Sequence, residues 1–186
     1  MIGRVMEAET TAENDATLAR LDVQPADDVL EVGFGPGRAL ERVGGMVTTG
    51  RVAGVEASEE MLRMAARRCR RLVRDGRVEL RAGTAERLPF PDAAFDKAYS
   101  VHTLYFWERP AAVVAELRRV LRPGGLLALC FRPTDAPGTA DFPSTVYRFY
   151  TGAEVGGFLR EGGFDEVSVT ETGGPRALLL ATGRVR

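Results

Sequence analysis

The stretch Asp28-Val-Leu-Glu31-Val-Gly33-Phe-Gly35-Pro-Gly37-Arg38 decides the fold that this sequence predicts. A short apolar run with one acid near its end meets three glycines at alternate positions, and apolar residues then return with helical spacing. This order predicts a strand, a tight turn and a helix. Glycines let a ligand approach the main chain closely, and the first N–H groups of a helix are unpaired and partly positive. The turn is therefore predicted to bind a polar ligand.

Strand-like and helix-like patterns alternate on both sides of this turn. Their alternation predicts right-handed βαβ units and an α/β fold, with a doubly wound, Rossmann-like and mainly parallel sheet covered by helices on both faces. The last two strands are expected to form an antiparallel hairpin. Strands are expected at 28–32, 51–56, 77–82, 95–101, 126–131, 165–171 and 177–184. Helices are expected before residue 24, after Arg38, from Ser58 to about Arg74, from Pro110 to Leu121, and at 151–161.

Length and composition favour one domain. A chain of 186 residues with 45% hydrophobic content can bury one core and is too short for two ordinary domains. We expect an N-terminal helix or cap (1–24), a cofactor-binding core (25–131), a lid loop (132–150), and a C-terminal helix with the hairpin (151–186). This N-terminal segment is either a surface helix that packs beside the sheet or a mobile cap over the ligand, with residues 1–13 as the flexible part of the cap.

Charge and cysteine content exclude several classes of function. A net charge of −1 and a pI near 6.0 give no electrostatic reason to bind nucleic acid or an anionic membrane, so a small molecule is the expected partner. Cys69 and Cys130 are expected to be buried free thiols, and His102 is the single histidine, so no metal site is predicted. No apolar run approaches the ~18 residues that span a bilayer, and a cytoplasmic location is expected.

Two positions indicate which ligand the turn binds. The dinucleotide fingerprint Gly-x-Gly-x-x-Gly would need a third glycine at position 38, which is Arg38. The second predicted strand ends in Glu56, and an acid at this place in such sheets accepts hydrogen bonds from ribose hydroxyls. Arg38 therefore speaks against a nicotinamide dinucleotide, and Glu56 is the expected ribose-binding acid, with a solvated acid or a helix-start carboxylate as the alternative.

Aromatic residues follow the fourth predicted strand and fill the predicted lid. His102 and Tyr105 are expected to line a pocket, because ligands in these sheets lie outside the carboxyl ends of the strands. Phe106 and Trp107 are instead expected to pack under the next helix. The lid is read as the substrate side of the site; its aromatic residues are Phe142, Tyr147, Phe149 and Tyr150.

Four stretches, in order, resemble the class I S-adenosylmethionine-dependent methyltransferases, in particular the small type 11-like enzymes that act on small molecules or ubiquinone-like precursors. They are Val29 to Gly37, Val55-Glu56 with the helix after it, Gly83 to Phe95, and Leu117 to Leu126 with Arg-Pro-Gly-Gly. The resemblance implies a seven-stranded sheet whose last strand is inserted antiparallel. It also implies S-adenosylmethionine as the cofactor.

The resemblance further implies roles for individual residues. Glu31 and the glycine turn would hold the methionine portion, Glu56 the ribose, and the segment from Ser100 to His102 would lie near the sulfonium. The family usually has an aspartate where this chain has Thr84, so the adenine amino group would be bound by a backbone carbonyl or by Glu86. The implied cofactor-binding residues are Glu31, Gly33, Phe34, Gly35, Gly37, Glu56, Ala57, Met61, Thr84, Ala85, Glu86, Ser100 and Val101.

Methyl transfer by in-line displacement depends mainly on positioning the acceptor against the methyl group. Phe34, Tyr105 or a lid aromatic could place a ring face near the sulfonium. His102 is the candidate base for a hydroxyl or ammonium acceptor, and the alternative is a histidine that only orients the acceptor or lines the pocket. Three rival functions stay open: a nicotinamide oxidoreductase, a S-adenosylmethionine-binding regulatory or assembly protein, and an aminopropyl or related transferase. The identity of the acceptor and the oligomeric state are not predicted.

Overall fold

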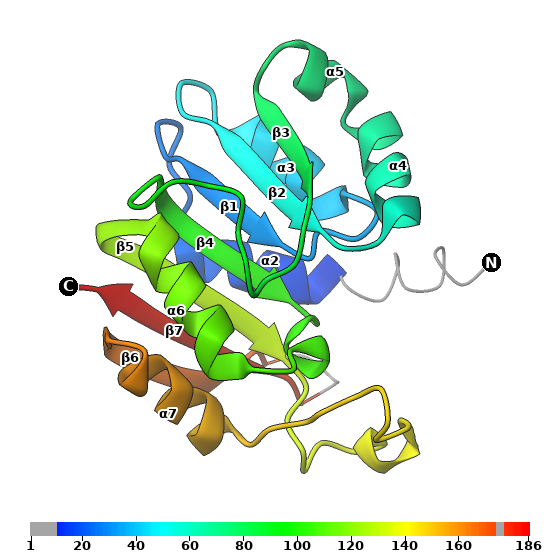
Figure 1. The fold of residues 1–186 in the computed structure, drawn as a ribbon, viewed down its shortest axis with the longest axis vertical. Helices are drawn as coiled ribbons and strands as arrows, with labels where there is room; N and C mark the ends of the chain where they lie inside the picture. Colours follow the sequence, from blue (N-terminus) through cyan, green and yellow to red (C-terminus); the bar gives the residue numbers. More distant parts are fainter. Residues whose placement is uncertain (1–10, 174–176) are drawn as a thin grey trace.

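The computed structural model describes residues 11–173 and 177–186. It contains one seven-stranded sheet with the order β3-β2-β1-β4-β5-β7-β6 (Figure 1). Six strands run in the same direction, and β7 is antiparallel to both of its neighbours, β5 and β6. The strands are β1 (Val29–Val32), β2 (Val52–Glu56), β3 (Val78–Ala82), β4 (Phe95–Val101), β5 (Leu121–Phe131), β6 (Phe164–Glu171) and β7 (Leu179–Val185). The predicted mixed sheet, with its last strand inserted antiparallel, is confirmed.

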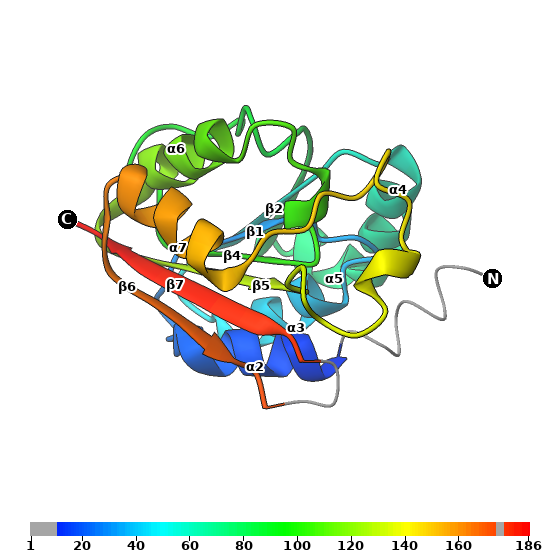
Figure 2. The same ribbon diagram turned by 90° about the horizontal axis from the view of Figure 1, so that it is seen from below.

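Helices cover both faces of the sheet and make three layers (Figure 2). On one face lie α2 (Thr11–Leu21), α3 (Arg38–Met46), α4 (Glu59–Arg68) and α5 (Arg70–Arg74). On the other lie α6 (Pro110–Val120) and α7 (Gly152–Glu161). None of the helices in the described ranges is long and apolar enough to cross a membrane.

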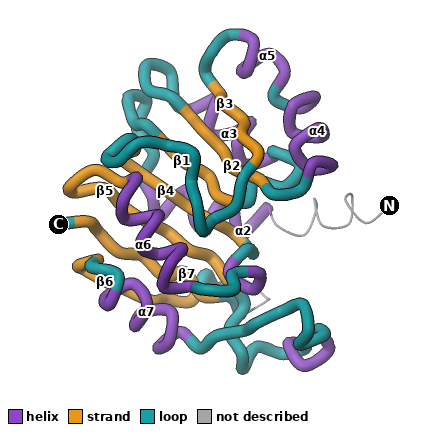
Figure 3. The backbone as a smooth tube through the Cα atoms, in the orientation of Figure 1, coloured by secondary structure: helices purple, strands orange, loops and turns teal. Residues whose placement is uncertain are grey.

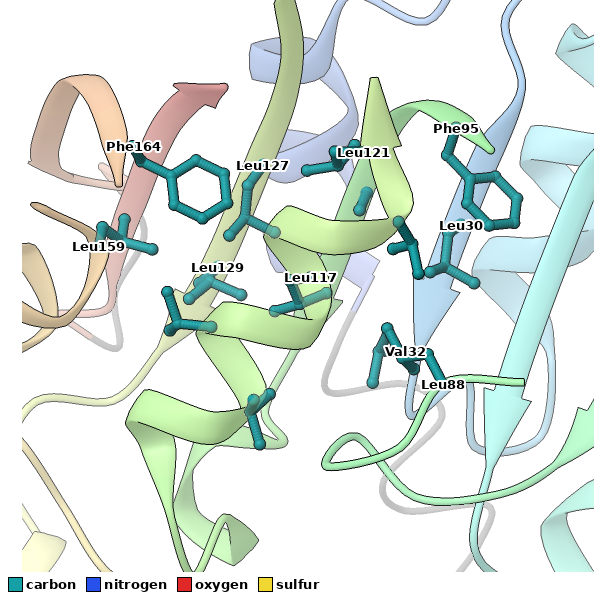
Figure 4. Packing of buried hydrophobic residues seen from close by; sticks show 14 of the residues in the cluster. Leu30, Val32, Leu88, Phe95, Leu117, Leu121, Leu127, Leu129, Leu159 and Phe164 are labelled. Carbon is teal, nitrogen blue, oxygen red and sulfur yellow. The ribbon is translucent and has the colours of Figure 1, made fainter. Parts of the chain in front are cut away.

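The core between α6, α7 and the sheet fixes the strands whose ends form the site. Figure 4 shows Leu117 of α6 among side chains of β5 and β1, including Leu127, Leu129 and Leu30. All four are at most 2% exposed. Burial of a leucine contributes about 1.5–3 kcal/mol, so this apolar layer holds β1 and β5 in place relative to each other.

The long segment between β5 and α7 is a loop with one helical turn, η2 (Thr139–Asp141), as Figure 3 shows. The backbone N–H of Arg148 donates to the carbonyl of Tyr105 at 3.0 Å, which attaches this segment to η1 (Leu104–Phe106). The helix after the loop begins at the predicted capping box, in which Thr151 and Glu154 bond each other's backbone N–H groups. The loop therefore lies against the carboxyl end of β4.

Two predicted elements differ in detail. The helix expected from Ser58 onwards is divided at Cys69 into α4 and α5, and the Cys69 thiol donates to the carbonyl of Gly37 at 3.6 Å. The Arg-Pro-Gly-Gly stretch, expected as a turn before a strand starting at 126, belongs to β5. It forms an irregularity there, because Phe95 pairs with Leu121 and Lys97 already pairs with Leu126. Both differences arise from pairing and packing with distant segments.

Candidate active site

A cavity of about 430 Å³ opens at the carboxyl ends of β1, β2 and β4. This volume falls within the ~300–1,000 Å³ of typical small-molecule sites. Its walls come from the glycine turn, the end of β2 with the start of α4, the segment after β3, and the segment after β4. The lining residues among those described are Asn14, Glu31, Val32, Gly33, Phe34, Gly35, Pro36, Arg38, Ala39, Val55, Glu56, Ala57, Met61, Gly83, Thr84, Ala85, Glu86, Val101, His102, Thr103, Phe106 and Trp107.

The three glycines of the turn all have left-handed backbones, with φ of +76° at Gly33, +52° at Gly35 and +82° at Gly37. A Cβ at Gly33 would lie 2.2 Å from Cγ2 of Thr103, and one at Gly37 would lie 2.7 Å from Cβ of Ala65. A Cβ at Gly35 would meet nothing within 4 Å. Gly33 and Gly37 thus allow close packing, and Gly35 leaves bare main chain facing the cavity.

This difference predicts unequal effects of two alanine substitutions. Both Gly33→Ala and Gly35→Ala put an alanine in a left-handed backbone, which is unfavourable for a residue with a Cβ. Only Gly33→Ala also overpacks against Thr103. Gly33→Ala should therefore destabilise the protein by about 1–3 kcal/mol more than Gly35→Ala, measured by urea unfolding. Adding Thr103→Ser, which removes Cγ2 and keeps the hydroxyl, should recover about half of that difference. Equal losses for the two alanine variants would contradict the packing role of Gly33.

Glu56 joins the two turns that border the cavity. Its Oε2 accepts the backbone N–H of Gly35 and its Oε1 accepts the N–H of Ser58, both at 2.9 Å. The Ser58 hydroxyl in turn accepts the N–H of Met61 at 3.3 Å and caps α4. A carboxylate has about four lone-pair sites, so Glu56 retains acceptor capacity for a ligand in the cavity.

Glu31 is a buried acid in the floor of the cavity. It is 4% exposed, and the hydroxyl of Tyr99 donates to its Oε2 at 2.8 Å. Burial raises the pKa of Glu31 to about 8. The Tyr99 hydrogen bond opposes this rise in pKa, while the nearby Glu56 charge adds to it. A cation bound beside Glu31 would favour its ionised form.

His102 and Tyr105 form a hydrogen-bonded pair after β4. The backbone of His102 is left-handed, with φ of +59°, and its N–H donates to the carbonyl of Cys130 at 2.9 Å. Its Nδ1 lies 2.9 Å from the Tyr105 hydroxyl, which accepts the backbone N–H of Arg132 at 2.6 Å. Tyr105 is 6% exposed, and burial raises the pKa of its hydroxyl above the usual range. The phenol therefore connects the ends of β4 and β5.

The profile of a family described as a methyltransferase domain matches residues 30–129 of this chain. The chain belongs to this methyltransferase family. The matched residues run from β1 through β5 and include every strand whose end borders the cavity.

One curated protein and two solved structures are similar to this chain over most of its length. An uncharacterized methyltransferase of Bacillus subtilis, YdaC, is 30% identical over 167 residues, which are 90% of this chain and 87% of that protein. A SAM-dependent methyltransferase from Aquifex aeolicus has the same fold, with a TM-score of 0.78 and 24% identity over 94% of this chain and 90% of that one. The [4+2]-cyclase SpnF also shares the fold, with a TM-score of 0.81 and 22% identity over 93% of this chain and 79% of that one.

The cavity brings together most of the residues predicted from the sequence. The predicted residues in its wall are Glu31, Gly33, Phe34, Gly35, Glu56, Ala57, Met61, Thr84, Ala85, Glu86, Val101 and His102. Gly37, Ser100 and Tyr105 lie behind the wall. Gly37 packs on Ala65, and the Ser100 hydroxyl donates to the carbonyl of Val32 at 2.8 Å. The prediction that Tyr105 lines the pocket was therefore wrong: its ring is buried, and its neighbour Phe106 lines the cavity instead. Gly37 and Ser100 do not line the cavity either.

The prediction for Phe106 was wrong. Its ring is 51% exposed and lines the cavity, whereas Trp107 is 3% exposed and contributes to both the core and the wall. Sequence reasoning also missed Asn14 of α2, which reaches the cavity from a helix with no recognisable site motif. Metal ligation finds no support in the described ranges, where no three His, Cys, Asp or Glu side chains gather as a metal site would need.

Proposed function

We propose that this methyltransferase transfers the methyl group of S-adenosylmethionine to a small-molecule acceptor. The proposal rests on one observation: the backbone of Gly35, which faces open space, and the two acids Glu31 and Glu56 line the same cavity. A ligand with a cationic amino-acid end and a vicinal diol fits this donor and acceptor set. The open space at Gly35, which any Cβ would enter, gives such a ligand room beside the turn.

Each portion of the cofactor has a matching part of the wall. Glu31 would bind the ammonium group, since a buried carboxylate favours a bound cation. Glu56 would accept the ribose hydroxyls with the lone pairs that Gly35 and Ser58 leave available. The adenine would lie between Ala57 and Met61 on one side and the segment after β3 on the other; that segment contributes Thr84, Ala85 and Glu86.

S-adenosylmethionine supplies a methyl group on a positively charged sulfur, open to in-line displacement by a nucleophile. The protein's part is to hold the acceptor in line and to exclude water, which can supply ~7–11 kcal/mol of barrier reduction. His102 lines the cavity after β4, which supports a role beside the nucleophilic atom. We propose it as the residue that handles or orients that atom.

The acceptor side of the site is aromatic. Phe106 lines the cavity, and its ring centroid is 5.2 Å from that of Tyr147, which lies 5.0 Å from that of Phe142. Phe106 and Phe142 are 51% and 39% exposed, so apolar surface continues from the cavity onto the loop before α7. This surface supports an aromatic or apolar small molecule as the acceptor.

Calorimetric titration tests the cofactor assignment. S-adenosylhomocysteine should bind with micromolar or tighter affinity and NAD should not, because Arg38 stands where a dinucleotide fingerprint has glycine. Binding of NAD alone would overturn the proposal. A labelled-methyl assay across small acceptors then separates a transferase from a protein that binds the cofactor without transfer. SpnF, named a cyclase, makes that second assay necessary.

A further inference from the structure

We propose that Tyr105 is a positioning residue that holds neutral His102 in the tautomer with its proton on Nε2. In this tautomer His102 donates a hydrogen bond into the cavity and does not act as a base there. The tautomer follows from the structure alone, while its use in catalysis rests on the proposed function.

The hydrogen bonds at the Tyr105 hydroxyl define the direction of its proton. A phenol has one proton to donate, and its oxygen accepts bonds from other donors. The Arg132 backbone N–H, 2.6 Å away, can only donate to that oxygen. In the described part of the chain, Nδ1 of His102 at 2.9 Å is the only acceptor recorded within hydrogen-bond distance for the phenol proton. If Nδ1 also donated, a buried phenol proton would be left without a partner, which is costly.

Both partners are held by packing and by backbone hydrogen bonds, so this geometry is a property of the fold. The Tyr105 ring packs on Phe149 with centroids 4.9 Å apart, and its carbonyl accepts the N–H of Arg148. His102 adopts a left-handed backbone, which is uncommon for a residue with a side chain, and it is fixed by its bond to Cys130. Backbone conformations of this kind concentrate at functional sites.

A neutral imidazole that accepts at Nδ1 carries its proton on Nε2. Tyr105 lies behind the cavity wall and His102 lines the wall, so the ring edge opposite Tyr105 is the one that faces the cavity. An Nε2–H group there binds a lone pair. The acceptor class that fits is one whose nucleophile arrives with a free lone pair, such as a phenolate, carboxylate, thiolate or uncharged amine.

Nitrogen-15 NMR of the tag-free protein tests the tautomer directly. His102 is the single histidine, so its two ring nitrogens give the only imidazole signals. Above the pKa of the ring, the wild-type protein should show a lone-pair nitrogen at Nδ1 and a protonated one at Nε2. Tyr105→Phe should raise the fraction protonated at Nδ1 by about two- to tenfold, since one hydrogen bond is lost.

The matched control is Tyr147→Phe, which removes a hydroxyl from a ring 6.3 Å from that of Tyr105 and should leave both signals unchanged. A proton on Nδ1 in the wild-type protein overturns the proposal, and so does an identical spectrum for a folded Tyr105→Phe. The wild-type spectrum decides the question even if that variant fails to fold. Titration with S-adenosylhomocysteine is scored separately, so a failure of the proposed function is distinguishable from a failure of the tautomer.

Discussion

Glu56→Gln is expected to weaken the binding of S-adenosylhomocysteine by about 10²- to 10⁴-fold. The carboxylate accepts two backbone N–H groups at 2.9 Å and is proposed to accept the ribose hydroxyls as well. Hydrogen bonds to a charged acceptor contribute about 1.5–3 kcal/mol each, and the loss of two corresponds to that range of affinity. A carboxamide keeps one acceptor oxygen, but its NH₂ group would face the N–H of either Gly35 or Ser58. The turn and the start of α4 would then separate.

Calorimetry with S-adenosylhomocysteine measures this effect, with unfolding curves recorded in parallel. Glu60→Gln is the matched control, because Glu60 is an exposed acid in the first turn of α4 and does not line the cavity. It should change affinity less than twofold. If Glu56→Gln binds the ligand as the wild type does, the carboxylate has no part in the cofactor site.

The parts of the site that were predictable from sequence are those fixed by local geometry. The glycines after β1 need left-handed backbones, and an acid that ends β2 must lie beside the turn because β1 and β2 are adjacent and parallel. Neighbouring parallel strands end at the same edge of a sheet, so the position of Glu56 follows from the strand pattern alone. Thr84, Ala85 and Glu86, which only the family resemblance implied, line the same cavity after β3.

The parts that could not be predicted depend on packing between distant segments. Phe106 and Tyr105 are adjacent in η1, yet one faces solvent and the other is buried, because Phe149 covers the Tyr105 ring. Likewise, Asn14 reaches the cavity only because α2 packs on β4 and β5. Aromatic composition indicates a pocket, but it does not say which ring faces it.

Glu31→Gln is expected to remove most of the pH dependence of stability between pH 5 and 8. The pKa of Glu31 in the folded protein is about 8, against an ordinary value of 4.5. Between these values the folded protein holds a proton that the unfolded chain has lost, so stability falls as pH rises. The free energy of unfolding falls by about 1.4 kcal/mol per pH unit, or about 4 kcal/mol from pH 5 to 8. This fall is absent below pH 4.5 and complete above pH 8.

Glutamine resembles the protonated acid, since its oxygen can still accept the Tyr99 hydroxyl, and it carries no charge to titrate. Urea unfolding at pH 5 and pH 8 should therefore show that the free energy of unfolding of the variant increases relative to that of the wild type as pH rises. Parallel pH profiles would mean that Glu31 is ionised in the folded protein at pH 5.

Glu31→Gln is expected to affect stability and ligand binding in opposite directions. If the carboxylate of Glu31 binds the ammonium group, the variant should be more stable at pH 8 and yet bind S-adenosylhomocysteine about tenfold or more weakly, as expected for one lost charged hydrogen bond. In the wild type, binding would then release a proton below pH 8, because the cation favours the ionised acid. Calorimetry in two buffers with different enthalpies of ionisation detects this release. A gain in stability with no loss of affinity would place the ammonium group elsewhere in the cavity.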